Sequence, residues 1–198
     1  MVVKTYITHS NWQRSDESTD RLKSGRETGY NKRMFSRKAK APEQVEKDGE
    51  RMDTQDRVRN VSIQLHSLIR HPGQEQEMHE LSLAGQFIEK KGKSYLKYEE
   101  QQNGTVVRTT VKLDAEDALI LRSGAVTMRL PFSANDKRPG TYGNGPASFN
   151  LLVETDHLEF ITGADESTGR FHVAYHLHAE GSLLGTYELT ITYTEGIL

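Results

Sequence analysis

Residues 95–113 read YLKYEEQQNGTVVRTTVKL, two alternating stretches on either side of Asn103-Gly104. Asn-Gly favours a two-residue type I′ turn, because such a turn needs positive φ angles and matches the twist of a hairpin. The predicted register pairs Gln102 with Thr105, Glu100 with Val107, Glu99 with Arg108, Tyr98 with Thr109, and Leu96 with Val111. One face of this hairpin is apolar, and the other carries a cross-strand ion pair between Glu99 and Arg108.

Three further hairpins are predicted from the same alternation of apolar and polar residues. A turn at Ser123-Gly124 pairs Leu121 with Val126 and Leu119 with Met128, which leaves Arg122 and Arg129 on the opposite, polar face. A turn at Asp156-His157 aligns Thr155 with Leu158 and Val153 with Phe160. A loop over residues 180–182 aligns Phe171, Val173, Tyr175 and Leu177 with Ile191, Leu189, Tyr187 and Gly185.

Residues 61–65 and 81–87 alternate in the same way, so residues 58–198 hold about ten strands and no long helix. Such a sheet hides its apolar face in a sandwich or in a barrel. The short connections favour a barrel, which also removes exposed strand edges. We therefore predict an all-β fold, a single antiparallel up-and-down β-barrel of about 8–10 strands. The Gly- and Pro-containing stretch 133–148 is expected to be a long loop able to act as a lid or plug.

Residues 1–57 lack any apolar periodicity and are predicted to form a disordered, charge-rich tail. Residues 1–52 hold 12 Lys and Arg against 8 Asp and Glu, a charge of +4, whereas the rest of the chain carries −6. The acidic barrel is a poor candidate for nucleic-acid binding. The basic cluster 31–40, with Phe35, is compatible with weak contact to RNA or anionic lipid, but a solvated spacer is the preferred interpretation.

A further hypothesis concerns the start of translation. Met52 lies just before the first strand, after residues 46–51 whose codons are largely purine and could form a ribosome-binding site. Translation from Met52 would leave residues 1–51 out of the native protein, and intact-mass measurement would decide this.

The chain has no cysteine, which excludes disulfides and thiolate chemistry and fits a reducing, cytoplasmic setting. No secretory signal and no membrane span are predicted. No Gly-x-Ser-x-Gly elbow, phosphate loop or His-Glu-x-x-His motif occurs, so no catalytic residue and no cofactor is expected.

Several segments resemble the YwiB-like family of small bacterial proteins, a family of unknown function. They are residues 92–100 (GKSYLKYEE), 121–128 (LRSGAVTM), 169–170 (GR), 174–175 (AY) and 189–193 (LTITY). The resemblance covers residues 60–196 and implies a calycin-like, lipocalin-like β-barrel in a bacterial cytoplasm. It implies no activity, cofactor or catalytic residue, and a fold shared with ligand-binding barrels is only an analogy for function.

Polar residues on the predicted inner face are the candidate ligand-binding residues: Tyr98, Glu100, Thr109, Tyr175 and Tyr187. An inward carboxylate at position 100 needs a partner or water, because burial of an unpaired charge is costly. The alternative is that Glu100 reaches solvent at the strand end and that the tyrosines are ordinary core residues. Arg122 is a candidate anion clamp, although strand parity favours a surface position.

His172, His176 and His178 share the polar face of one strand, and the i, i+2 spacing of the last two allows metal binding. No carboxylate falls into the same local pattern, so solvent-facing histidines are preferred and no metal is expected. The preferred hypothesis is a non-enzymatic barrel that binds a small or extended ligand at one open end through Tyr98, Glu100, Tyr175 and Arg122. The alternative is a protein- or RNA-interaction module with a packed core, acting through its outer face or its tail.

Overall fold

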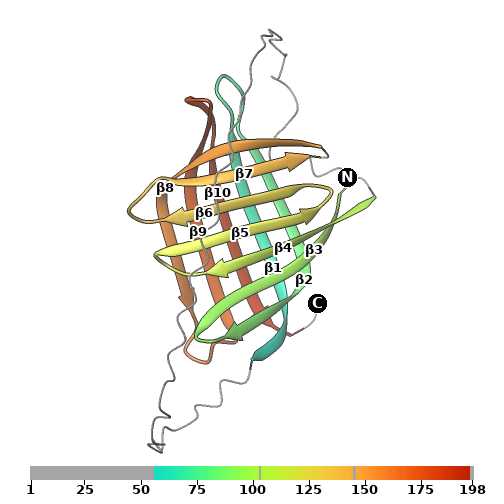
Figure 1. The fold of residues 1–198 in the computed structure, drawn as a ribbon. Helices are drawn as coiled ribbons and strands as arrows, with labels where there is room; N and C mark the ends of the chain where they lie inside the picture. Colours follow the sequence, from blue (N-terminus) through green and yellow to red (C-terminus); the bar gives the residue numbers. More distant parts are fainter. Residues whose placement is uncertain (1–55, 103, 145, 197–198) are drawn as a thin grey trace, which may run out of the picture. The chain divides into compact units, whose positions relative to one another are not determined.

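A computed structural model describes residues 56–102, 104–144 and 146–196, which form ten strands. The strands are β1 (Arg57–Arg70), β2 (Glu77–Lys90), β3 (Lys93–Gln102), β4 (Thr105–Leu113), β5 (Asp117–Gly124), β6 (Thr127–Ser133), β7 (Arg138–Asn144), β8 (Ala147–Thr162), β9 (Thr168–Ala179) and β10 (Ser182–Glu195). Each strand pairs antiparallel with the next, and β1 pairs with β10, so the sheet closes into a barrel (Figure 1). The predicted fold class, a closed antiparallel β-barrel without helices, is confirmed for these residues. The predicted tail, the cluster 31–40 and Met52 lie outside the described residues.

The β3–β4 hairpin has the register that Asn103-Gly104 predicts. Glu99 lies opposite Arg108 and Tyr98 opposite Thr109, and Gly104 has a φ of +75°. The Arg108 Nε donates to Glu99 Oε1 at 2.9 Å on the outer face. The β9–β10 hairpin also has its predicted pairs from Phe171–Ile191 to Leu177–Gly185, although its turn is tighter than expected because Ser182 already pairs with Ala179.

The predicted β5–β6 register is wrong. Leu121 lies opposite Arg129, and Arg122 opposite Met128, so the connection between the strands is longer than a turn at Ser123-Gly124. Gly124 still belongs to β5, with a φ of +114°, and a Cβ there would lie 2.0 Å from the Val106 carbonyl oxygen. This glycine therefore allows close strand approach, and the turn follows it. As a result Leu121 faces solvent and Arg122 faces the interior.

The predicted hairpin at Asp156-His157 is also wrong, and so is the predicted loop 133–148. Residues 147–162 form one continuous strand, β8, with a bulge between Thr155 and His157. Its partner is β7, which occupies the stretch expected to be a loop and buries Gly140 and Tyr142. A bulge adds one residue to a strand and so shifts the alternation of inward and outward side chains, as a turn between two strands also does. This explains why the sequence pattern around residues 156–157 predicts a hairpin. The strand count was right because these two errors cancel.

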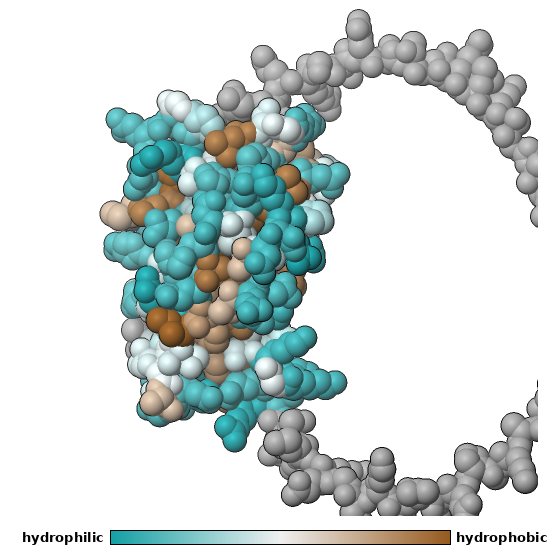
Figure 2. Space-filling view, turned by 90° about the vertical axis from the view of Figure 1, so that its left-hand side faces the viewer, coloured by the Kyte–Doolittle hydropathy of each residue, from teal (hydrophilic) through white to brown (hydrophobic). Residues whose placement is uncertain are grey.

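The barrel interior is filled mainly by aliphatic and aromatic side chains from every strand. One end of the core contains the Phe87 and Tyr193 rings, which stack with centroids 4.8 Å apart. The Tyr193 ring also covers Gly169, its partner on the adjacent strand, where a Cβ would lie 2.4 Å from the ring. The outer face drawn in Figure 2 is mainly hydrophilic with scattered hydrophobic residues. No helix of the described part is long and apolar enough to cross a membrane.

Candidate functional site

Three of the candidate residues form one inward-facing row across adjacent strands. Tyr98 on β3 lies opposite Thr109 on β4, and Thr109 lies opposite Arg122 on β5. All three are buried, with exposed fractions of 7%, 2% and 5%. The row exists because the Asn-Gly turn sets the β3–β4 register and because the glycine at position 124 lets β5 approach β4 closely.

Arg122 and Glu100 form an ion pair inside the barrel. The Arg122 Nη2 contacts Glu100 Oε1, and the two side chains are 4% and 8% exposed. The expectation that Arg122 lies on the surface is therefore wrong, because the corrected β5–β6 register turns it inward. Glu100 does not simply reach solvent at the strand end. Each charge offsets the cost of burying the other, and together they place a neutral but strongly polar group in an otherwise apolar interior.

A cavity of about 30 Å³ lies beside this ion pair. All six candidate residues line it: Tyr98, Glu100, Thr109, Arg122, Tyr175 and Tyr187. They come from both walls of the barrel, because β9 and β10 supply the two tyrosines at 175 and 187 and β3 to β5 supply the others. A buried water needs about 10–15 Å³ measured in this way, so the cavity holds a group of about two or three heavy atoms. It is much smaller than a pocket for a drug-sized ligand.

Three buried hydroxyl groups also line the cavity. The oxygens of Ser67, Thr109 and Tyr187 make no hydrogen bond to any described residue, and each residue is 2% exposed. Buried hydroxyls in native proteins almost always have a hydrogen-bond partner, either a protein group or an ordered water molecule. Burial raises the pKa of Tyr187, which keeps its hydroxyl protonated and able to donate. The cavity therefore offers hydroxyl donors and acceptors around one paired charge.

Ser67 was missed at the sequence level. The alternation of β1 continues past Leu65 to Ser67 and Ile69, and all three are buried. Extending that alternation by one step would have placed Ser67 on the inner face.

Comparison with known proteins identifies the family. Residues 63–191 match the family described as Domain of unknown function (DUF1934). The chain belongs to this family. It is 29% identical over 136 residues to a Bacillus subtilis (strain 168) protein described as "Uncharacterized beta-barrel protein YwiB", with 69% of this chain and 94% of that protein covered. A solved structure, "Crystal structure of ywiB protein from Bacillus subtilis", matches with a TM-score of 0.63 and 27% identity over 71% of this chain and 94% of the other.

These matches confirm the resemblance to the YwiB-like proteins and the barrel fold. They cover every candidate residue of the cavity, since Ser67 to Tyr187 lie within the matched range. The descriptions of the family and of its Bacillus protein name no ligand or activity. The function of this DUF1934 barrel therefore has to be argued from its own geometry.

Histidines and carboxylates gather on the outer face of β8 to β10. His172, His176 and His178 each lie beside a carboxylate, with closest N–O distances of 3.0 Å to Glu188, 3.1 Å to Asp156 and 3.0 Å to Glu154. The three histidines are half-buried rather than fully exposed. Sequence spacing gave no sign of these partners, because they come from β8 and β10, and strand pairing brings them to β9.

Proposed function

We propose that the DUF1934 barrel binds the polar end of a small or extended ligand in the cavity beside Arg122 and Glu100. The observation that carries this proposal is the combination of one buried ion pair and three buried, unpartnered hydroxyls around one space. A core selected only for packing would not place five polar side chains around the same cavity, since each buried polar group costs free energy unless it is hydrogen-bonded.

The charges that line the cavity indicate whether the bound group is charged or neutral. Glu100 already neutralises Arg122, so a charged ligand group would be buried without a counter-charge. The hydroxyls of Ser67, Thr109 and Tyr187 can each donate and accept. These features favour a neutral group with both donors and acceptors, such as a primary amide or an alcohol.

The size of the cavity indicates how much of the ligand fits inside it. About 30 Å³ accepts a group of two or three heavy atoms, so the rest of a longer molecule would extend along the barrel or out of it. Apolar side chains such as Ile120 and Leu130 line the same cavity and would contact the alkyl part of the ligand. An amide or alcohol on an apolar chain fits this lining.

A thermal-shift series tests the proposal. The full-length chain would be titrated with acetamide, glycerol, hexanamide and hexanoate, where hexanoate is the charged match to hexanamide. We expect hexanamide to raise the melting temperature and hexanoate to have no effect. At a hundredfold excess over its dissociation constant, a bound ligand adds about 2.7 kcal/mol to the free energy of unfolding. No stabilisation by either neutral amide, or stabilisation by the anion alone, would overturn the proposed ligand chemistry.

Matched variants separate binding from general stability. Thr109→Val removes one cavity hydroxyl without changing side-chain shape and should abolish the shift with hexanamide. Thr110→Val alters the next residue, which is partly exposed on the opposite face of β4, and should leave that shift intact. An equal shift in both variants would exclude the cavity as the binding site.

A second candidate, a protein-interaction module with a packed core, has its own support. The interior leaves little free volume, and Leu152 and Leu183 lie exposed on either side of His178 on the outer face. Exposed apolar side chains rimmed by polar residues are typical of a surface that contacts another protein. Charge substitution of both leucines, followed by pull-down and mass spectrometry, would test it: a partner retained by the doubly charged variant would exclude this anchor.

A further inference from the structure

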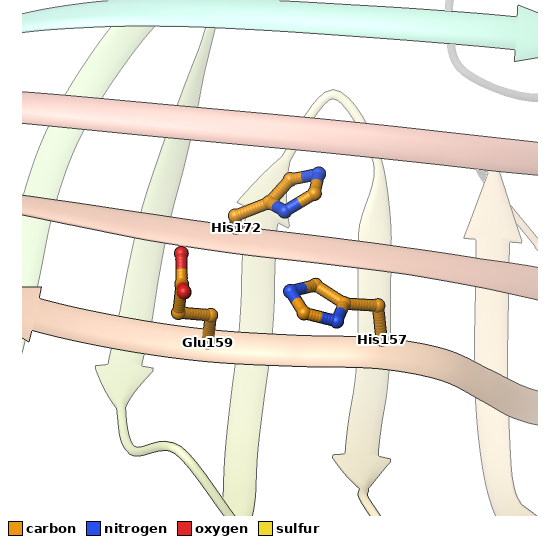
Figure 3. Close-up of side chains that lie close together, drawn as sticks. All are labelled: His157, Glu159 and His172. Carbon is orange, nitrogen blue, oxygen red and sulfur yellow. The ribbon is translucent and has the colours of Figure 1, made fainter.

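We propose that His157, Glu159 and His172 bind a divalent transition-metal ion, of the zinc class, on the outer face of the barrel. Each residue offers one ligand atom, and these atoms lie within 4.8 Å of one another. Figure 3 shows His157 and Glu159 on β8 and His172 on β9, with the three side chains grouped on the same side of the sheet. Two imidazoles and one carboxylate are a common ligand set for zinc, and they leave a fourth position open to water.

The β-bulge in β8 creates this cluster. Thr155 lies opposite Tyr175, and the register then shifts so that His157 lies opposite Ala174. Without the extra residue, His157 would share the inward face with Thr155, because strand residues two apart point the same way. The shift turns His157 outward, two residues from Glu159 and diagonal to His172, the direct partner of Glu159.

A carboxylate from the third strand orients the metal-binding ring. The Nε2 atom of His172 lies 3.0 Å from Glu188 Oε1 on β10, and the His172 side chain is only 16% exposed. A hydrogen bond from Nε2–H to this carboxylate leaves Nδ1 unprotonated and available for a cation. Carboxylates hold zinc-binding histidines in this way and increase their basicity. This arrangement distinguishes His172 from a histidine that is merely close to other polar groups.

Metal binding would require only a small movement of the three ligand side chains. In tetrahedral coordination with bonds of about 2.0–2.1 Å, ligand atoms lie about 3.3 Å apart, so no pair of ligand atoms has to close by more than about 1.5 Å. His157 is exposed and Glu159 is partly exposed, so rotation about their side-chain bonds can supply this movement. Arg170 is the opposing charge, because its Nη1 lies 3.5 Å from Glu159 Oε2. A cation would displace this loose contact.

Isothermal titration of the untagged full-length chain with Zn²⁺ tests the site. We expect saturable binding, a loss of at least tenfold in affinity for His172→Ala and for Glu159→Gln, and a loss of about tenfold for Glu188→Gln. Arg170→Met should tighten binding, because it removes a cation beside the site. The melting temperature of each variant without metal shows whether it is folded, and the rise in melting temperature with Zn²⁺ gives a second readout of binding.

Two matched controls keep the test specific. His176→Ala removes a histidine on the same face of β9 that is paired with Asp156, and His66→Ala removes one on β1 that is paired with Glu80. Both should bind Zn²⁺ as the unchanged chain does. Absence of saturable binding, unchanged affinity in folded His172→Ala, or an equal loss in His176→Ala would each overturn the proposal.

Discussion

Arg122 on β5 and Glu100 on β3 form an ion pair across β4, inside a barrel whose other contents are mostly apolar. The two residues are not direct strand partners: Arg122 lies opposite Thr109, and Glu100 lies opposite Val107. The long arginine side chain spans the diagonal between two neighbouring rows. The pair therefore depends on the registers of both hairpins, and a shift in either would leave a charge buried alone.

Removing one member of this pair should be strongly destabilising. We expect Arg122→Met to lower the free energy of unfolding by about 3–5 kcal/mol, because the Glu100 carboxylate is left buried and unpaired. Urea unfolding followed by circular dichroism measures this. In the double variant Arg122→Met with Glu100→Leu most of the stability should return. A double variant as unstable as the single one would show that the charges themselves are not the cause.

The ion pair on the outer face of the β3–β4 hairpin is the comparison for the buried pair. Glu99 and Arg108 are 61% and 65% exposed and directly opposite each other. Water screens such pairs, so Glu99→Gln should change the free energy of unfolding by less than about 1 kcal/mol. Urea unfolding under the same conditions measures it. A loss as large as that of Arg122→Met would contradict the assigned difference in burial.

Thr109→Val should stabilise the barrel slightly in the absence of ligand. The Thr109 hydroxyl is buried without a hydrogen-bond partner among the described residues, so its replacement by a methyl group removes a desolvation cost of about 1 kcal/mol. Thr110→Val, on the other face, should change stability by no more than about 0.5 kcal/mol. Denaturation midpoints of both variants check this, and a marked loss of stability in Thr109→Val would mean that the hydroxyl has a protein partner.

Stability should fall in strongly alkaline solution because of buried tyrosine. Burial raises the pKa of Tyr193 to about 12, above its ordinary value of 10. The folded chain then binds more protons than the unfolded chain between these values, so the contribution is complete below pH 10 and is lost as pH rises to 12. Tyr193 alone should account for about 1–3 kcal/mol of this decline. The raised pKa values of Tyr187 and Tyr142 act in the same direction.

Tyr193→Phe provides the check on this pH dependence. The ring and its stacking on Phe87 remain, but the ionisable hydroxyl is lost. The slope of unfolding free energy against pH between 10 and 12 should be shallower in this variant. An identical slope in both proteins would assign the alkaline decline to other groups.

Gly169→Ala should destabilise the barrel by about 1–3 kcal/mol. A Cβ at this position would lie 2.4 Å from the Tyr193 ring, and that ring is held by its stack on Phe87. Thermal unfolding measures the loss. In a Tyr193→Leu background the same glycine substitution should cost less, because the obstructing ring is gone, and an undiminished cost would contradict this cause.

The sequence by itself determined the fold class and two hairpins. Alternating residues with one apolar face, joined by short turns, favour a closed antiparallel sheet over a sandwich, and Asn103-Gly104 sets a register that the structure reproduces pair by pair. It also identified five polar residues of the cavity, because the inner face of β3, β4, β9 and β10 follows directly from those registers: Tyr98, Glu100, Thr109, Tyr175 and Tyr187.

Only the tertiary structure decided the position of Arg122 and the outward turn of His157. Both depend on backbone irregularities, the close approach at Gly124 and the bulge after Thr155, each of which changes the face on which later residues lie. Local alternation cannot distinguish a bulge from a turn, since both interrupt the two-residue period. The partners of Arg122 and His172 lie on other strands, so the pairing of neighbouring strands, and not spacing along one strand, brings Glu100, Glu159 and Glu188 to them.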